Sequence, residues 1–135
     1  MAVYGRDEAD WNCLVETGRA FLIERARLQK ITTYTELNAI LERRTGLAGF
    51  DFRHAGERAA MGHLLGLIVE RDFPTTGLML SSLVQYLDAN DAGSGFYKLA
   101  AQLGALEARA SARAKEDFWI RQVNAVYAHY ARAVD

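Results

Sequence analysis

The feature that most constrains how this chain can fold is the segment of residues 31–41, ITTYTELNAIL. Thr33 and Glu36 have the spacing of a capping box, in which a threonine hydroxyl accepts a hydrogen bond from the backbone N–H three residues later. The apolar residues that follow recur at the spacing of one helical face, namely Leu37, Ile40 and Leu41. The segment therefore predicts a helix that begins at Thr33 and buries one side, and Gly46 is expected to end it.

Apolar periodicity predicts further elements on both sides of this helix. We expect helices over residues 7–30, 57–71 and 116–134, and a short helix or a strand-to-helix transition over residues 96–103. A strand is expected over residues 78–87, because both of its alternating faces are largely apolar. Asp72 and Pro74 are expected to close the third helix, since proline interrupts helical hydrogen bonding. Residues 106–115 could be helical or a frayed connection.

Composition supports one domain that spans residues 1–135. The chain is 50% hydrophobic, which is ample for one core, and it contains a single proline and no Gly/Ser-rich or Pro-rich tract. The fold class that follows is α+β and predominantly α. It has a central helix-turn-helix with one short β element, flanked by long N- and C-terminal helices. The aromatic C-terminal helix is expected to dock onto the first helix or onto a second copy of the protein.

Charge and cysteine content narrow the possible partners and compartments. The formal net charge is -1 and the pI is about 6.3, whereas proteins that contact many phosphates usually carry a basic excess. Cys13 is the only cysteine, so no intramolecular disulfide can form. It stands among the apolar positions of the first helix, and we expect it to be buried. Without an apolar leader or a membrane-length apolar run, the chain is expected to be cytoplasmic and to lack a membrane contact.

No catalytic or metal-binding set is assembled in the sequence. The three histidines are far apart and have no cysteine at ligand spacing, so we expect no metal site. The acidic turn at residues 88–91 resembles a calcium loop but lacks its closing glutamate, and it is interpreted as a solvated turn. The glycine-rich residues 92–96 precede a helix and have Lys98 close by, so an anion could sit there, although this is a weak signal. We expect no cofactor.

The middle of the chain resembles the C-terminal winged-helix domain of the alkylguanine-DNA alkyltransferases and the alkyltransferase-like proteins. The matching pieces are residues 32–36 (TTYTE), residues 58–62 (RAAMG), residues 78–82 (LMLSS) and residues 93–97 (GSGFY), in the family's order and over about half the chain. The resemblance implies a winged-helix-like centre and a DNA-binding surface.

The family's chemistry does not carry over with this resemblance. Its nucleophilic cysteine falls at or beside Ser82, and Leu83 stands where its histidine would be. Its intercalating arginine falls at Ala59, with Arg58 one step away. Tyr34 alone matches a functional residue of the family, and a serine without an adjacent base is a poor nucleophile.

We therefore weigh three functions. The first is a small cytosolic binding or adaptor protein, not an enzyme, whose helix-turn-helix core or aromatic-rich terminal helices contact a protein partner or a second copy. The second is a DNA-binding protein of the alkyltransferase-like kind without alkyl transfer. Its expected contact residues are Tyr34, Arg53, Arg58, Ser94 and Tyr97. The third, and the least supported, is a hydrolase or transferase centred on Ser82.

Overall fold

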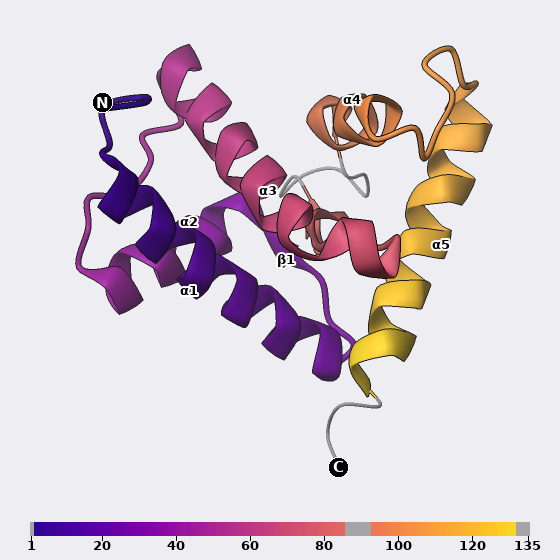
Figure 1. The fold of residues 1–135 in the computed structure, drawn as a ribbon, viewed down its shortest axis with the longest axis horizontal. Helices are drawn as coiled ribbons and strands as arrows, with labels where there is room; N and C mark the ends of the chain where they lie inside the picture. Colours follow the sequence, from indigo (N-terminus) through magenta and orange to yellow (C-terminus); the bar gives the residue numbers. More distant parts are fainter. Residues whose placement is uncertain (1, 86–92, 132–135) are drawn as a thin grey trace.

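The computed structural model describes residues 2–85 and 93–131, which are mostly helical with one two-stranded parallel sheet (Figure 1). This confirms the predicted fold class, α+β and predominantly α. In chain order the elements are α1 (Glu8–Arg27), β1 (Thr32–Thr33), α2 (Tyr34–Thr45), α3 (Ala55–Thr76), the 3₁₀ turn η1 (Leu80–Leu83), β2 (Val84–Gln85), α4 (Ser94–Gln102) and α5 (Ala112–Ala131).

The start of α2 forms as its sequence predicts. The Thr33 hydroxyl accepts a hydrogen bond of 3.1 Å from the Glu36 backbone N–H, and the Glu36 carboxylate accepts one from the Thr32 hydroxyl. The helix ends where Gly46 adopts a left-handed conformation, with φ of 73°, and its N–H bonds back to the Glu42 carbonyl. Both ends of α2 are therefore fixed by local chemistry.

The strand predicted over residues 78–87 is wrong in most of its length. Leu80–Leu83 forms a buried 3₁₀ turn, and only Val84–Gln85 is extended, where it pairs in parallel with Thr32–Thr33. Residues 86 and 87 lie outside the described part of the chain. An apolar run that is buried on all sides has no periodicity of its own to separate a strand from a helical turn.

The predicted end of α3 is also wrong, because the helix runs through Pro74 to Thr76. Pro74 lacks the N–H that would bond to the Glu70 carbonyl. Both residues are exposed, so water can satisfy that carbonyl and the helix continues for another turn. The helix ends instead at Gly77, whose φ of 69° is left-handed.

The buried side chains form two neighbouring clusters. The larger one joins α1, α2, α3, η1, β2 and α5, and its most buried members include Leu22, Leu37, Leu64 and Ile68. The smaller one consists of Val69, Met79, Phe96, Ala100, Phe118 and Trp119. Since α4 packs only into the smaller cluster, it stands apart from the N-terminal half of α3, and the space between these two helices holds the groove described below.

The C-terminal helix α5 packs against α1, which is one of the two arrangements expected from the sequence. Trp11 of α1 and Trp119 and Tyr130 of α5 are buried inside the chain. These rings therefore do not form an exposed partner surface. Residues 103–111 connect α4 to α5 without a helix, and α5 begins at Ala112. Of residues 106–115, for which the sequence allowed either a helix or a connection, 106–111 are therefore a connection and 112–115 are helical.

Cys13 is exposed, which corrects the prediction that it is buried. The inward face of α1 is formed by Trp11, Leu14, Val15 and Gly18. Position 13 points to the opposite side, because each residue of a helix is rotated by about 100° from the last.

No helix within residues 2–85 and 93–131 combines the length and the apolar character that crossing a bilayer would require.

Candidate binding groove

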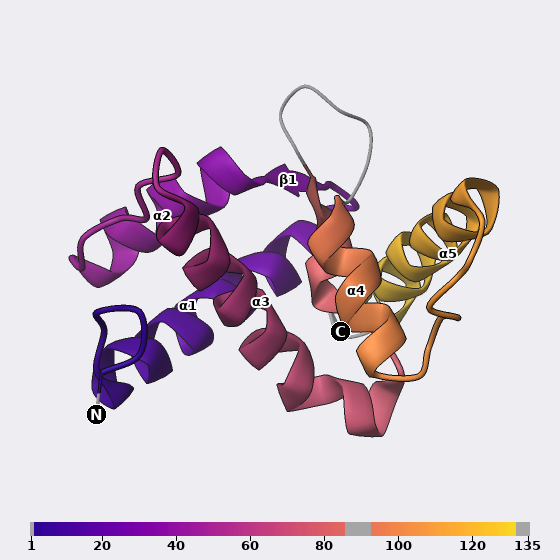
Figure 2. The same ribbon diagram turned by 90° about the horizontal axis from the view of Figure 1, so that it is seen from above.

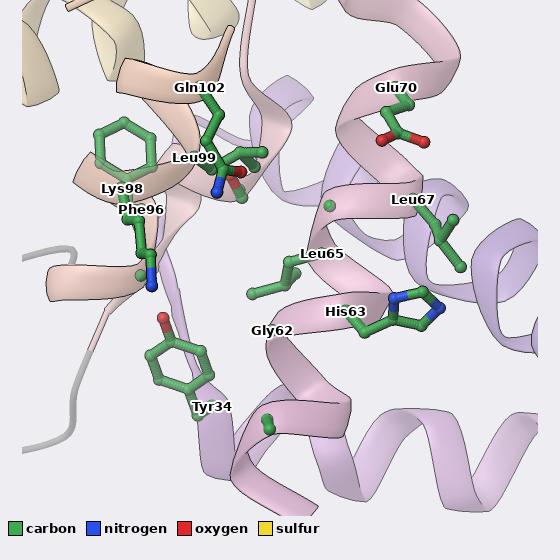
Figure 3. Close-up of a pocket in the computed structure, with 14 residues that line it drawn as sticks. Tyr34, Gly62, His63, Leu65, Leu67, Glu70, Phe96, Lys98, Leu99 and Gln102 are labelled. Atoms are coloured by element: carbon green, nitrogen blue, oxygen red, sulfur yellow. The ribbon is translucent and has the colours of Figure 1, made fainter. Parts of the chain in front are cut away.

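A groove of about 460 Å³ lies between α3 and α4 (Figure 3). Tyr34, at the first position of α2, and Ser81, in η1, complete its lining. Its volume falls in the range of natural ligand sites, which are mostly apolar with a few polar groups. It is open to solvent, because several lining residues are exposed, including Gly62, Glu70, Lys98 and Gln102.

The α3 side of the groove carries a strip of small residues beside Leu65, whose side chain points toward α4 in Figure 3, and His63 and Leu67 also line this side. Ala59, Gly62, Gly66 and Glu70 follow one another at intervals of three or four residues, so they share one face of the helix. At Gly62 and Gly66 an added Cβ atom would meet nothing within 4 Å. Glycine inside a helix costs about 1 kcal/mol relative to alanine, so these two positions reduce helix stability for no reason found within the described chain.

A third helical glycine, Gly18 of α1, is different. A Cβ at this position would lie 2.9 Å from the Cδ1 atom of Ile68, a fully buried side chain of α3. Close packing of α1 on α3 therefore explains Gly18, whereas no contact among the described residues explains Gly62 or Gly66.

The opposite wall is longer and carries functional groups. Phe96, Lys98, Leu99 and Gln102 of α4 line it. In Figure 3 the Tyr34 hydroxyl and the Lys98 amine point toward each other from α2 and α4. The groove thus has a strip of small residues beside Leu65 on one side and a polar, partly aromatic edge on the other.

Ser81 and Ser82 lie in η1, and their surroundings differ. Both are buried, with exposed fractions of 4% and 0%, and neither Oγ atom has a hydrogen-bond partner in the described part of the chain. Ser81 lines the groove, whereas Ser82 does not. Among the described residues, no base accepts a hydrogen bond from the buried Ser82 hydroxyl. Its surroundings therefore do not support the hypothesis of a hydrolase or transferase centred on Ser82.

The structure brings together only some of the expected nucleic-acid contacts. Tyr34 lines the groove, and α4 begins at the exposed Ser94 next to the lining residues Gly95 and Phe96. Tyr97 turns from the groove toward the smaller core cluster, where its ring contacts Phe96 at a centroid distance of 5.3 Å.

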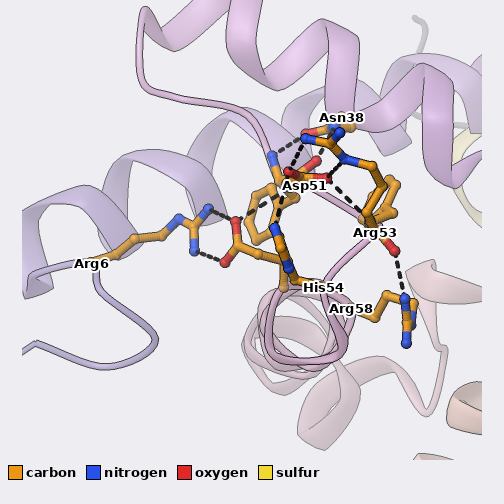
Figure 4. Close-up of polar contacts among 9 residues, drawn as sticks. Arg6, Asn38, Asp51, Arg53, His54 and Arg58 are labelled. Atoms are coloured by element: carbon orange, nitrogen blue, oxygen red, sulfur yellow. Dashed lines mark hydrogen bonds and ion pairs between the residues drawn. The ribbon is translucent and has the colours of Figure 1, made fainter.

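Arg53 and Arg58 do not line the groove (Figure 4). Arg53 is exposed and forms an ion pair of 2.8 Å with Asp51, and this guanidinium holds the pKa of the Asp51 carboxyl well below its usual range. Arg58 is exposed in the first turn of α3 and donates a 2.6 Å hydrogen bond to the Phe52 carbonyl. Both side chains brace the loop before α3.

The same end of α3 is fastened to the N-terminal segment. Arg6 donates hydrogen bonds of 2.9 and 3.0 Å to the two carboxylate oxygens of Glu57, and its guanidinium lies 4.1 Å from the ring centroid of Phe50 (Figure 4). The hydrogen bond from Arg6 lowers the pKa of Glu57. This paired arrangement orients α3 but leaves the groove face free.

Within the described part of the chain, no group of three or more His, Cys, Asp or Glu side chains is placed to hold an ion. Comparisons of the chain with protein-family models, with curated proteins and with solved structures found no match.

Sequence reasoning did not identify Gly62, Gly66, Glu70 and Ser81 as site residues. A signal for Gly62 and Gly66 was present, because Ala59, Gly62 and Gly66 recur at helical spacing on the polar side of a long helix. Ser81 carried no such signal, because only the 3₁₀ turn brings it to the groove.

Proposed function

We propose that this chain is a small cytosolic binding protein, not an enzyme, that presents the groove between α3 and α4 to a protein partner. The observation that carries the proposal is the pair Gly62 and Gly66, exposed and half-buried respectively, where an added Cβ atom would meet nothing within 4 Å. A strip of small residues lets a partner's backbone approach the helix closely, and a partner that docks there would recover the stability that glycine costs the free protein.

The test is to fill the groove without disturbing the core. A Gly66→Leu variant adds a side chain into open space, and Ala39→Leu adds the same side chain to an exposed position of α2 outside the groove. Both variants and the unchanged chain are tagged and recovered from the native host, and the co-purified proteins are compared. We expect a partner that is retained by the unchanged chain and by Ala39→Leu, and lost with Gly66→Leu.

If the same proteins are recovered with all three chains, the groove is not the contact surface. Far-UV circular dichroism and thermal unfolding of each variant ensure that a lost partner does not reflect a lost fold.

A second candidate is DNA binding of the alkyltransferase-like kind without alkyl transfer. It is favoured by one observation: Tyr34, Ser81 and the start of α4 border one groove, and they belong to separate pieces of the sequence resemblance. The exposed Lys98 would supply a phosphate contact. The winged-helix interpretation of the centre belongs to this same candidate.

Salt dependence separates the two candidates. If DNA is the ligand, fluorescence anisotropy with a short duplex shows binding that weakens steeply between about 50 and 200 mM salt, and Lys98→Gln reduces the slope by about one contact. Absence of binding at low salt would exclude this candidate and leave the first untouched.

A further inference from the structure

Ser81 is a buried polar residue in the wall of the groove whose hydroxyl has no partner. The residue is 4% exposed, and its Oγ atom makes no hydrogen bond within the part of the chain that the structure describes. A buried hydroxyl without a partner reduces the stability of a protein. Since this one borders the groove, a ligand that enters the groove can supply the missing partner.

The groups near the start of α4 favour a negatively charged ligand. Lys98 is exposed and forms no ion pair with any residue in ranges 2–85 and 93–131. The Tyr34 hydroxyl points toward its amine in Figure 3. The first turn of α4 reaches the groove at Gly95, and it contains no acidic residue and no side-chain cap. The backbone N–H groups and the dipole of a helix start also attract a negative charge.

The groove suits one negative charge and not a row of charges. Among its described lining residues, Lys98 is the only lysine or arginine, and Glu70 is the only acid. Nucleic acids present many phosphates, and a phosphorylated side chain is typically met by a cluster of arginines. One lysine with a few hydrogen-bond donors is instead sufficient for a single carboxylate. In Figure 3 Glu70 lies toward the end of the groove away from Tyr34, where it would repel a second carboxylate.

We propose that the groove recognises its protein partner by one carboxylate side chain, an aspartate or a glutamate. Lys98 supplies the opposite charge, and the Ser81 hydroxyl donates a hydrogen bond. The inference rests on the proposed function, because it names the group by which the partner is bound.

The dimensions of the groove fit a short segment of a partner. From Gly62 to Glu70 the α3 side extends about 12 Å, at 1.5 Å per residue, which is the length of about four extended residues. Figure 2 shows α3 and α4 side by side with no other helix of the described chain in front of them, so the segment can enter from this side. A short peptide can therefore contain the whole recognition element.

Peptide selection tests the preference for an acidic residue. Random heptapeptides displayed on phage are selected against the purified full chain and against two variants, Lys98→Gln and Arg121→Gln. Arg121 is exposed on α5 and does not line the groove, so its substitution removes the same charge elsewhere. We expect the unchanged chain and Arg121→Gln to select peptides with aspartate or glutamate at one position, and Lys98→Gln to lose this preference.

The adjacent serines provide a matched comparison with one selected peptide. Ser82 is buried and unpartnered within the described chain like Ser81, but it does not line the groove. In fluorescence anisotropy, Ser81→Ala should raise the Kd about tenfold, because it removes a hydrogen bond to a charged group, and Ser82→Ala should leave it unchanged. Neither variant removes a side-chain hydrogen bond found in the described chain, so thermal unfolding should show no loss of stability in either.

Selected peptides without an acidic preference overturn the inference, and so does a selection that enriches no sequence. An acidic peptide that binds equally well to Lys98→Gln or to Ser81→Ala does the same. If short duplex DNA binds through Lys98 and no acidic peptide is selected, the inference fails in favour of the DNA-binding candidate.

The host co-purification described above keeps the two proposals separate. If the acidic preference is absent but Gly66→Leu still loses a co-purified protein, the groove binds its partner by other contacts and only the carboxylate assignment fails. If the preference is absent and no partner depends on Gly66, both proposals fail.

Discussion

The indole N–H of Trp119 donates a buried hydrogen bond of 2.8 Å to the backbone carbonyl of Ser82. This bond joins α5 to η1, and the two bonded residues are 37 positions apart in the sequence. Because Ser81 precedes Ser82 in the same turn and lines the groove, the C-terminal helix helps to position the groove floor.

Replacing Trp119 by phenylalanine should destabilise the protein. Trp119→Phe keeps an aromatic ring but leaves the buried Ser82 carbonyl without this donor, and the expected loss in free energy of unfolding is about 1–3 kcal/mol. Urea unfolding followed by circular dichroism measures it. Trp11→Phe is the comparison, because its indole donates to the Val3 carbonyl in a part-buried setting that water can reach more easily, so its hydrogen-bond loss should be smaller.

Adding a methyl group to the groove glycines should stabilise the free protein. Gly62→Ala and Gly66→Ala meet no atom within 4 Å and replace glycine by the best helix former, so each should raise the free energy of unfolding by up to about 1 kcal/mol. Thermal unfolding checks the result. If either substitution destabilises the chain, that position has an internal role and does not support a docking face.

The matched glycine substitutions should behave differently. Gly18→Ala should gain less than Gly62→Ala, because the Ile68 side chain has to move inside a packed core. Gly46→Ala should destabilise by about 1 kcal/mol, since its φ of 73° is unfavourable for a residue with a Cβ atom. The same ranking measured by chemical unfolding would confirm that the four glycines serve three separate purposes.

The Arg6–Glu57 pair should make stability depend on pH in the acid range. Arg6 lowers the folded-state pKa of Glu57 from its ordinary 4.5, so the pair's stabilisation is fully present above that value and is lost as pH falls toward the folded-state pKa. At pH 7 we expect Glu57→Gln to lose about 1–3 kcal/mol. Below pH 4 the difference between the variant and the unchanged chain should shrink. A difference that stays constant from pH 7 to pH 3 would contradict this assignment.

The helix start at Thr33 offers a local test. Thr33→Ala removes the hydroxyl that accepts from the Glu36 N–H and should cost about 1 kcal/mol, whereas Thr33→Ser retains the acceptor and should cost less. Chemical unfolding of the three chains measures both effects. Equal losses for alanine and serine would mean that the methyl group, and not the cap, matters at this position.

The sequence by itself determined the parts of this protein that depend on neighbours in the chain. The cap at Thr33, the left-handed glycine at Gly46 and the inward face of α1 were readable because their causes lie within one or two helical turns. The helical spacing of that inward face also places Cys13 outside it. The apolar residues around Cys13 nevertheless led to the wrong prediction that it is buried.

Only the tertiary structure decided the rest. The apolar tract around Ser81 becomes a 3₁₀ turn and a two-residue strand because Thr32–Thr33 offers backbone groups to β2 and Trp119 donates to the turn, and both partners are distant in sequence. The groove exists because α4 packs into a cluster shared with α5 and the C-terminal part of α3, away from Gly62 and Gly66. A local pattern specifies which side of a helix is bare, but long-range packing decides whether another element covers that side.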